Sequence, residues 1–190
     1  MKKLRKAKLI RSNKRVSEHG EVFTPPHIVK DMHNLLDMDV WADKTLIYLE
    51  PTCGNGQFLV QAIQKKLDAG LSCLEAVNTV FGMDIMPDNI EESRLRILTI
   101  FMERVKKQKK GPQKAKVLRI ASIIVHNIFQ VKDSIDFMSR GELFDNPTQW
   151  ESYPFFDYDP TGNGMVLKEG KKAKEAAGKA LVERWHAQNA

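Results

Sequence analysis

The stretch from Tyr48 to Leu59 constrains the fold most, because it reads as a buried strand, a glycine-bearing loop and a helix. A short apolar run of strand length, 46–49, lies at its start. After the loop, apolar residues recur at helical spacing: Phe58, Leu59, Ala62, Ile63 and Leu67. Gly54 and Gly56 lack a Cβ, so backbone amides of this turn can approach a ligand at the helix N-terminus. The pattern predicts a ligand-binding turn, although a glycine pair alone also occurs in structural turns.

A second strand and helix follow at the spacing of a nucleoside-binding sheet. The apolar run 80–85 carries one carboxylate near its end, Asp84, and Pro87 precedes another helical pattern. The apolar positions of that helix are Ile90, Leu95, Ile97, Leu98 and Phe101. Strand, glycine loop, helix, strand, acid and helix is the order of a βαβ nucleoside site. Asp84 can therefore accept the hydroxyls of a ribose, and a helix N-cap or turn acid is the alternative.

Three segments in this order resemble motifs of the DNA adenine-N6 methyltransferases, which use S-adenosylmethionine (SAM). Residues 50–59 (EPTCGNGQFL) look like the SAM-binding loop of these enzymes. Residues 20–26 (GEVFTPP) resemble the F-T-P segment of type I and related modification methylases, and residues 81–85 (FGMDI) resemble the motif with the ribose acid. The resemblance covers residues 18 to 100 and implies an α/β fold with the Rossmann-like methyltransferase sheet.

The resemblance also implies a set of cofactor-binding residues. Phe23 and Thr24 would close over the methionine end of SAM, and Glu50 would receive its ammonium group. Asp84 would hold the ribose, and Ile85 would lie against the adenine ring. The complete set is Phe23, Thr24, Glu50, Pro51, Cys53, Gly54, Gly56, Phe58, Asp84 and Ile85. Singly, Phe23 and Ile85 are equally well explained as core, and Thr24 as a helix N-cap, so the prediction depends on the whole set.

The sequence departs from this family at the catalytic motif. Adenine-N6 methylases carry Asn- or Asp-Pro-Pro-aromatic, whose polar groups bond the target amine while the ring stacks on the flipped base. No such tetrapeptide occurs in this chain. The nearest segments are 145–150, which offers Asn146 and Pro147 as catalytic candidates, and 156–160, which has Asp-Pro without a following aromatic. We expect both segments to be loops, because neither follows a convincing buried strand.

The second half of the chain gives fewer signals. Residues 120–129 are expected to hold the next helix-to-strand passage. In related enzymes a polar residue near this point meets the cofactor adenine, and Asn127 and Asp133 are the candidates, although a turn role is favoured for Asn127. A basic linker, 106–116, precedes this passage. From Lys168 onward the sequence predicts an exposed helix whose narrow apolar stripe could dock on the core or on a partner.

Length and composition predict one sizeable core with tails, since the chain has 190 residues and 42% hydrophobic content. We expect a basic N-terminal arm (1–17), a SAM-binding core (18–140), and a divergent aromatic loop with a helical C-terminal tail (141–190). Methylases of this group are considerably longer, so the sheet is expected to be abbreviated. A truncated product, a subunit completed by a protein partner or oligomer, and a degenerate relative all remain open.

The N-terminal arm carries the positive charge of the chain. Residues 1–15 hold eight basic residues and no acid: Lys2, Lys3, Arg5, Lys6, Lys8, Arg11, Lys14 and Arg15. Without them the chain has 22 basic and 24 acidic residues, so the net charge of +6 comes wholly from the arm. Such an arm attracts phosphates without regard to sequence, which predicts DNA binding beside a methylase-like core. A solvated tail is the alternative.

Other classes of function find little support. The chain has no apolar run long enough for a membrane span and no secretion signal, and its two cysteines, Cys53 and Cys73, show no metal spacing. We therefore expect reduced thiols in the cytoplasm and no metal. Cys53 is not expected to be a nucleophile, because methyl transfer from a sulfonium to an amine needs no covalent intermediate.

The leading hypothesis is a SAM-dependent DNA adenine-N6 methyltransferase of phage, plasmid or restriction-modification type, which flips the base and transfers the methyl group directly. The alternative is a non-catalytic accessory or decoy module that binds SAM or DNA and derives from such a methylase. The missing tetrapeptide favours the alternative, and the cofactor loop favours the enzyme.

Overall fold

The computed structural model describes residues 9–107, 113–132, 156–159, 164–167 and 171–189. Its centre is a parallel sheet in the order β1 (Tyr48–Glu50), β2 (Val80–Asp84) and β3 (Ile128–Gln130). β2 is the central strand, paired with β1 and β3, and all five of its residues are buried. The parallel sheet confirms the predicted α/β class and matches a partial Rossmann-like methyltransferase fold.

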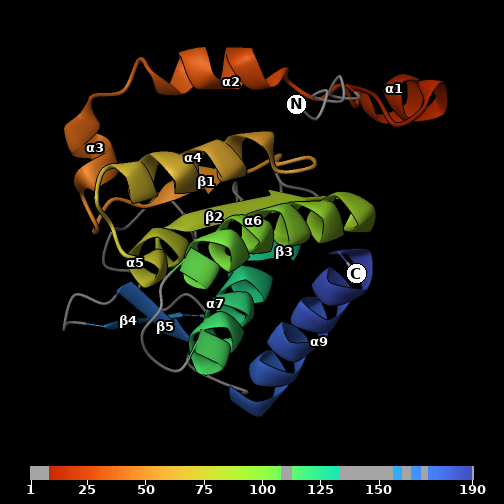
Figure 1. Cartoon of the computed structure of the whole chain (residues 1–190). Helices are drawn as coiled ribbons and strands as arrows, with labels where there is room; N and C mark the ends of the chain where they lie inside the picture. The colour runs from red at the N-terminus through yellow and green to blue at the C-terminus, as the bar shows by residue number, and fades with distance from the viewer. Residues whose placement is uncertain (1–8, 108–112, 133–155, 160–163, 168–170, 190) are drawn as a thin grey trace.

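Helices make both crossovers of this sheet, as parallel strands require. α4 (Gln57–Asp68) and α5 (Cys73–Asn78) join β1 to β2. α6 (Pro87–Lys107) and α7 (Gln113–Asn127) join β2 to β3. Figure 1 shows α4 and α6 lying across the sheet, where their apolar faces form much of the core. The predicted helix-to-strand passage at 120–129 is therefore the end of α7 followed by β3.

The starts of these helices follow local sequence signals. Ser72 caps α5 and forms a reciprocal capping box with Glu75, with each side chain bonded to the backbone amide of the other residue. Pro87 is the first residue of α6. The backbone N–H at this position would have no acceptor within the helix, so proline loses nothing by lacking it. α4 differs, because its N-cap is Gly56 and no side chain caps it. The first amides of α4 therefore have no side-chain acceptor at the end of β1.

The C-terminal helix α9 (Lys171–Asn189) docks on the core. Leu181 and Trp185 of its apolar stripe are buried, and the Trp185 indole donates to the hydroxyl of Thr99 at 2.9 Å. Gly178 lies so close to α7 that an added Cβ would stand 2.7 Å from the backbone nitrogen of Ser122. Of the two alternatives for this stripe, the structure therefore shows docking on the chain's own core.

One expectation for the second half of the chain was wrong. Residues Phe156–Asp159 form a strand, β4, which pairs antiparallel with β5 (Gly164–Leu167), whereas the sequence predicted a loop. The prediction looked for the continuous apolar run of a buried parallel strand, and an antiparallel hairpin does not need one. This pair is a separate sheet and does not extend β1-β2-β3. Asn146, Pro147 and Asp133 lie outside the described residues.

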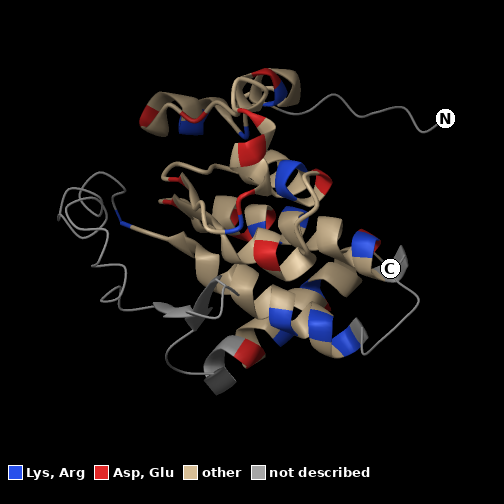
Figure 2. Ribbon diagram, turned by 90° about the vertical axis from the view of Figure 1, so that its left-hand side faces the viewer, with Lys and Arg blue, Asp and Glu red and all other residues tan. Residues whose placement is uncertain are grey.

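Three short helices precede β1: α1 (Asn13–His19), α2 (Pro26–His33) and α3 (Met38–Ala42). In Figure 1, α2 and α3 lie beside α4. Blue basic and red acidic segments are interspersed over the described elements in Figure 2. No helix in the described ranges is both long and apolar enough to cross a bilayer.

An aromatic cluster around His33 fixes α2 and α3 to β1. The His33 imidazole is 3% exposed and shares a hydrogen bond of 2.9 Å with the Tyr48 hydroxyl. The rings of Trp41 and Phe58 meet it edge-on, with centroids 5.1 and 5.5 Å away. Burial lowers the pKa of His33, and the charge of Lys65 lowers it further. The imidazole is therefore neutral in the folded chain at neutral pH.

This neutral histidine predicts an acid-sensitive core. Because the pKa of His33 is lower in the folded chain than in the unfolded one, the unfolded chain takes up the extra proton. The contribution of His33 is complete above its unfolded pKa of about 6.5 and is lost as the pH falls below that value. We expect the free energy of unfolding in urea to fall between pH 7 and pH 5 by at most about 1.4 kcal/mol per pH unit from this residue.

Two variants test this prediction. His33→Phe retains an aromatic ring but cannot titrate, and His27→Gln changes an exposed histidine of the same helix. His33→Phe should flatten the pH dependence, and His27→Gln should keep the wild-type curve. A His33→Phe curve as steep as that of the wild type would assign the acid sensitivity to other groups.

Candidate functional site

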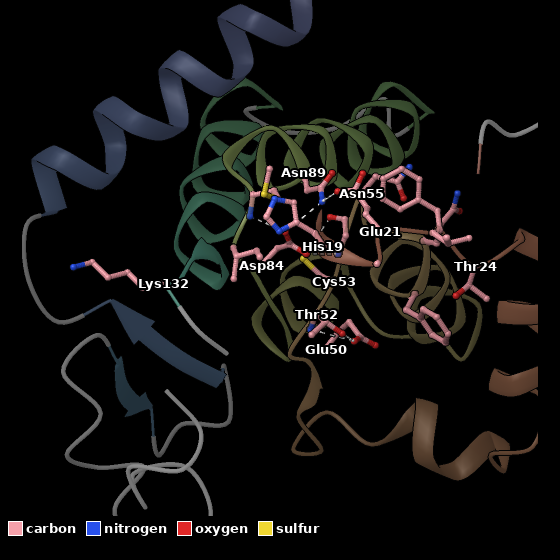
Figure 3. Close-up of a pocket in the computed structure, with 18 residues that line it drawn as sticks. His19, Glu21, Thr24, Glu50, Thr52, Cys53, Asn55, Asp84, Asn89 and Lys132 are labelled. Atoms are coloured by element: carbon pink, nitrogen blue, oxygen red, sulfur yellow. Dashed lines mark hydrogen bonds between the residues drawn. The ribbon is translucent and has the colours of Figure 1, made fainter. Parts of the chain in front are cut away.

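A pocket of about 520 Å³ opens at the carboxyl ends of β1 and β2, where α/β sheets bind ligands. Its walls come from residues 19–24, from residues 50–58 after β1, and from residues 84–89 after β2, with Lys132 at one edge (Figure 3). Eight of the ten predicted cofactor residues line it: Phe23, Thr24, Glu50, Cys53, Gly54, Phe58, Asp84 and Ile85. Pro51 and Gly56 belong to the same loop but do not line the pocket.

Asp84 joins the two strand ends. One of its carboxylate oxygens accepts from the backbone amide of Gly54 at 2.9 Å, across 30 residues of sequence. The other accepts from the Met86 amide at 2.8 Å and from the Asn89 side chain at 3.3 Å. The bond from the Met86 amide shows that Asp84 acts as a turn acid, which was the alternative to a ribose-binding role. The Gly54-bound oxygen keeps a second lone pair, so a role as turn acid leaves capacity to accept a ligand hydroxyl.

The glycine loop is held from behind by α6. Ser93 donates from its hydroxyl to the Gly54 carbonyl at 2.8 Å, and Arg96 donates to the Asn55 carbonyl at 2.7 Å. Arg96 also donates to the Gln57 side chain at 2.9 Å. Sequence reasoning missed Ser93 and Arg96; the available signal was two polar residues, one three positions after Ile90 and one two positions before Leu98, on a helix expected to bury its apolar set. These bonds fix the loop carbonyls on α6.

Both loop glycines have left-handed backbones, with φ of 52° at Gly54 and 81° at Gly56. A Cβ at Gly56 would stand 2.9 Å from the Ser93 hydroxyl and 3.1 Å from its Cα. A Cβ at Gly54 would stand 3.2 Å from the ring of Phe23, which is therefore packed against the loop. The F-T-P segment and the glycine loop thus form adjoining walls of the pocket.

An acid and a thiol, Glu50 and Cys53, complete the loop side of the pocket. Glu50 accepts from the amide and the hydroxyl of Thr52 at 3.3 and 3.4 Å, and burial raises its pKa above the ordinary value. A carboxylate whose pKa is raised by burial is stabilised by a nearby cation, because the attraction offsets the hydration that the carboxylate has lost. Burial, with the charge of Asp84, raises the pKa of Cys53 to about 12. Its thiol is protonated at neutral pH, in keeping with the expectation that it is no nucleophile.

A polar network that joins the pocket wall to residues 11–15 was not predicted; Glu21 and Asn89 of this network line the pocket. Glu21, whose side chain is 8% exposed, accepts from the Asn89 amide at 3.0 Å. Arg11 donates to the Asn89 oxygen at 3.0 Å and pairs with Glu92 at 2.6 Å. Arg15 pairs with Glu21 and Asp88, which lie outside its own helix. The described part of the predicted basic arm therefore contacts the start of α6 through Arg11 and Arg15, and the predicted boundary at residue 17 falls within α1.

The remaining predicted residues are not part of the pocket. Asn127 is buried and donates to the carbonyls of Val77 at 2.8 Å and Val80 at 3.3 Å, so it ties α7 to the strand before it. Lys14 is exposed beside Glu18. Lys2, Lys3, Arg5, Lys6 and Lys8 lie outside the described residues. Within the described residues, no group of three or more acids, histidines or cysteines could hold a metal ion.

The close approach at Gly56 predicts a specific loss of stability. Gly56→Ala introduces both a strained left-handed backbone and a contact with Ser93. Gly70 is the matched control, because its φ is 101° and nothing lies within 4 Å of an added Cβ. We expect Gly70→Ala to lower the free energy of unfolding by about 1–2 kcal/mol, and Gly56→Ala by a further 1–3 kcal/mol or so. Urea unfolding measures both; equal losses would mean that α6 does not crowd the loop.

Comparison with protein families matches residues 9–119 to the family described as N-6 DNA Methylase. The match includes the F-T-P segment, the glycine loop, the strand that ends at Asp84, and α6. Neither the curated proteins nor the solved structures contain a significant match. Because the matched region is more than half of the chain and contains the three motifs in the predicted order, the chain belongs to the N-6 DNA methylase family.

Proposed function

We propose that this chain binds SAM in the pocket at the ends of β1 and β2 and transfers the methyl group to N6 of adenine in DNA. One arrangement carries the proposal: Asp84, Glu50 and the start of α4 without a side-chain cap meet at a single cavity of about 520 Å³. The volume lies within the range of small-molecule sites. Membership of a family that uses SAM supports the same ligand.

The groups around the cavity match the polar parts of SAM. Asp84 would accept the ribose hydroxyls, and Glu50 would accept the ammonium group. The amides in the first turn of α4 have no side-chain cap and would donate to the carboxylate, as helix N-termini do for anions. Phe23 and the exposed side chain of Ile85 offer apolar surface for the remainder of the ligand.

Bound SAM would supply an electrophilic methyl group, and the adenine amine would attack it in line. The N–C bond forms as the S–C bond breaks, and the amine releases a proton. The described residues would orient the cofactor. Direct transfer needs no covalent intermediate, and the Cys53 thiol, which stays protonated at neutral pH, would not act as a nucleophile. Asn146 and Pro147 are the nearest match to the family's amine-binding motif, and we propose them for that contact. DNA attraction would come from the arm residues outside the described ranges, together with Lys14.

The cofactor assignment predicts that Asp84→Asn weakens SAM binding by about 10- to 100-fold, because a charged acceptor of hydroxyl hydrogen bonds is lost. Titration calorimetry on the purified chain measures the affinity, and SAM should also raise the melting temperature of the wild type. Asp68→Asn, on an exposed carboxylate of α4, is the control and should bind SAM as the wild type does. Unchanged affinity in Asp84→Asn would remove the ribose assignment.

Activity is tested by transfer of labelled methyl from SAM to unmethylated DNA, with the labelled base identified. Label on adenine N6, lost in Asn146→Ala while SAM binding persists, is the expected result. SAM binding without any label would favour the alternative, a non-catalytic accessory or decoy module. That alternative is favoured by one observation, the absence of an Asn- or Asp-Pro-Pro-aromatic tetrapeptide. The restriction-modification or phage context stays a prediction of the resemblance.

A further inference from the structure

The segment 9–22 forms part of the pocket wall with residues 19–22, and it carries two arginines that the charge pattern of the sequence would assign to DNA. We infer that Arg11 and Arg15 are positioning residues of the pocket, which act through Asn89 and Glu21 on the carboxylate of Asp84. The role in SAM binding rests on the proposed function. The role in holding Asp84 and the glycine loop concerns the chain alone and is testable without a ligand.

Asn89 is the centre of this arrangement. It is 1% exposed, and its NH₂ group donates to Glu21 at 3.0 Å and to Asp84 at 3.3 Å. Its oxygen accepts from Arg11 at 3.0 Å. The partners fix the orientation of the amide, because carboxylates only accept and a guanidinium only donates. Arg11 therefore selects the amide orientation that presents the NH₂ group to Asp84.

Arg15 supports the same centre from the other side. It pairs with Glu21 and with Asp88, and its side chain is only 16% exposed. The hydrogen bond to Asp88, followed by that to Glu21, raises the pKa of Arg15, and the pairing lowers the pKa of Asp88. Without Arg15, the buried carboxylate of Glu21 would keep only Arg11 as an ion-pair partner, at 4.0 Å, while it still shares the Asn89 NH₂ group with Asp84.

A second connection runs through the backbone and the ring of Phe23. The Phe23 amide donates to the Leu9 carbonyl at 2.7 Å, and the Arg11 guanidinium lies over the Phe23 ring, 5.7 Å from its centroid. Phe23 in turn packs on Gly54. Arg11 also pairs with Glu92, which accepts from the Asn55 side chain of the loop at 3.1 Å. The segment is therefore connected to the glycine loop, through Phe23 and Glu92, and to Asp84, through Asn89.

The geometry opposes a phosphate-binding role for these two side chains. To reach DNA, Arg11 and Arg15 would have to leave three carboxylates, one of them buried. Lys14 shows the contrast within the same segment, since its side chain is 79% exposed and its ion pair, with Glu18, measures 3.8 Å. Lys14→Gln therefore removes one charge from α1 without touching the network, which makes it a matched control.

The experiment compares Arg11→Gln, Arg15→Gln, Arg15→Lys and Lys14→Gln in the full chain with three measurements. The first is hydrogen exchange of the Gly54 and Met86 amides in the ligand-free chain, since both donate to Asp84. The second is SAM affinity by calorimetry. The third is the dependence of DNA affinity on salt, whose slope falls by about one for each phosphate contact removed.

We expect both glutamine variants to exchange the Gly54 amide faster and to bind SAM about tenfold more weakly, with an unchanged salt slope. Arg15→Lys keeps the charge and should recover part of both effects; if a glutamine variant does not fold, this variant decides. Lys14→Gln should leave exchange and SAM affinity as in the wild type. Faster exchange confined to Lys14→Gln, or exchange unchanged in all arginine variants, would overturn the inference.

Two outcomes separate this inference from the proposed function. Should the wild-type chain bind no SAM, the proposed function fails, and amide exchange alone decides whether the arginines hold Asp84. Should the wild type bind SAM while the arginine variants bind it equally well and lose one unit of salt slope, the arginines are phosphate contacts and the inference fails.

Discussion

The site depends on the hydrogen bond between the Asp84 carboxylate and the Gly54 amide, 2.9 Å long. This bond, together with the backbone hydrogen bond from the Cys53 amide to the Met83 carbonyl at 2.9 Å, joins the loop after β1 to the end of β2. Gly54 can make it because its backbone is left-handed, which turns the amide toward β2. The carboxylate thereby shapes the cavity that it also lines, so the structural role of Asp84 and the ligand-binding role proposed for it depend on the same contacts.

Helix α6 is the rigid body against which this geometry is set. Ser93 and Arg96 bind the loop carbonyls, and Asn89, one turn earlier, binds Asp84. Burial on the core lowers the pKa of Arg96, yet its donors are bonded to a carbonyl and a side-chain oxygen of the loop. Removing such a side chain would leave buried acceptors without partners, which costs more than the bond itself contributes. The left-handed turn at Gly54 and Gly56 is therefore held by contacts from one helix.

The sequence predicted those parts of the site that depend on neighbouring residues. The apolar runs, the loop glycines and Asp84 are local signals, and the structure brings eight of the ten proposed cofactor residues to one pocket. Contacts between distant residues were beyond such signals. Arg11 and Asn89 are separated by 78 positions, and a basic run without acids resembles a DNA-binding arm whether or not its arginines pair elsewhere. β4 was missed because its pairing partner, not its own apolar content, defines the strand.

The N-terminal charges therefore divide into two groups with different physics. Arg11 and Arg15 are held among carboxylates at 27% and 16% exposure, where screening by salt is weaker than on an open surface. Lys14 stands in solvent, where attraction to a polyanion is long-ranged and falls steeply with salt. Under the proposed function, the attraction of Lys14 to DNA and the order of the pocket would therefore respond to salt separately. Attraction to DNA could then weaken at ionic strengths that leave Asp84 and the glycine loop in place.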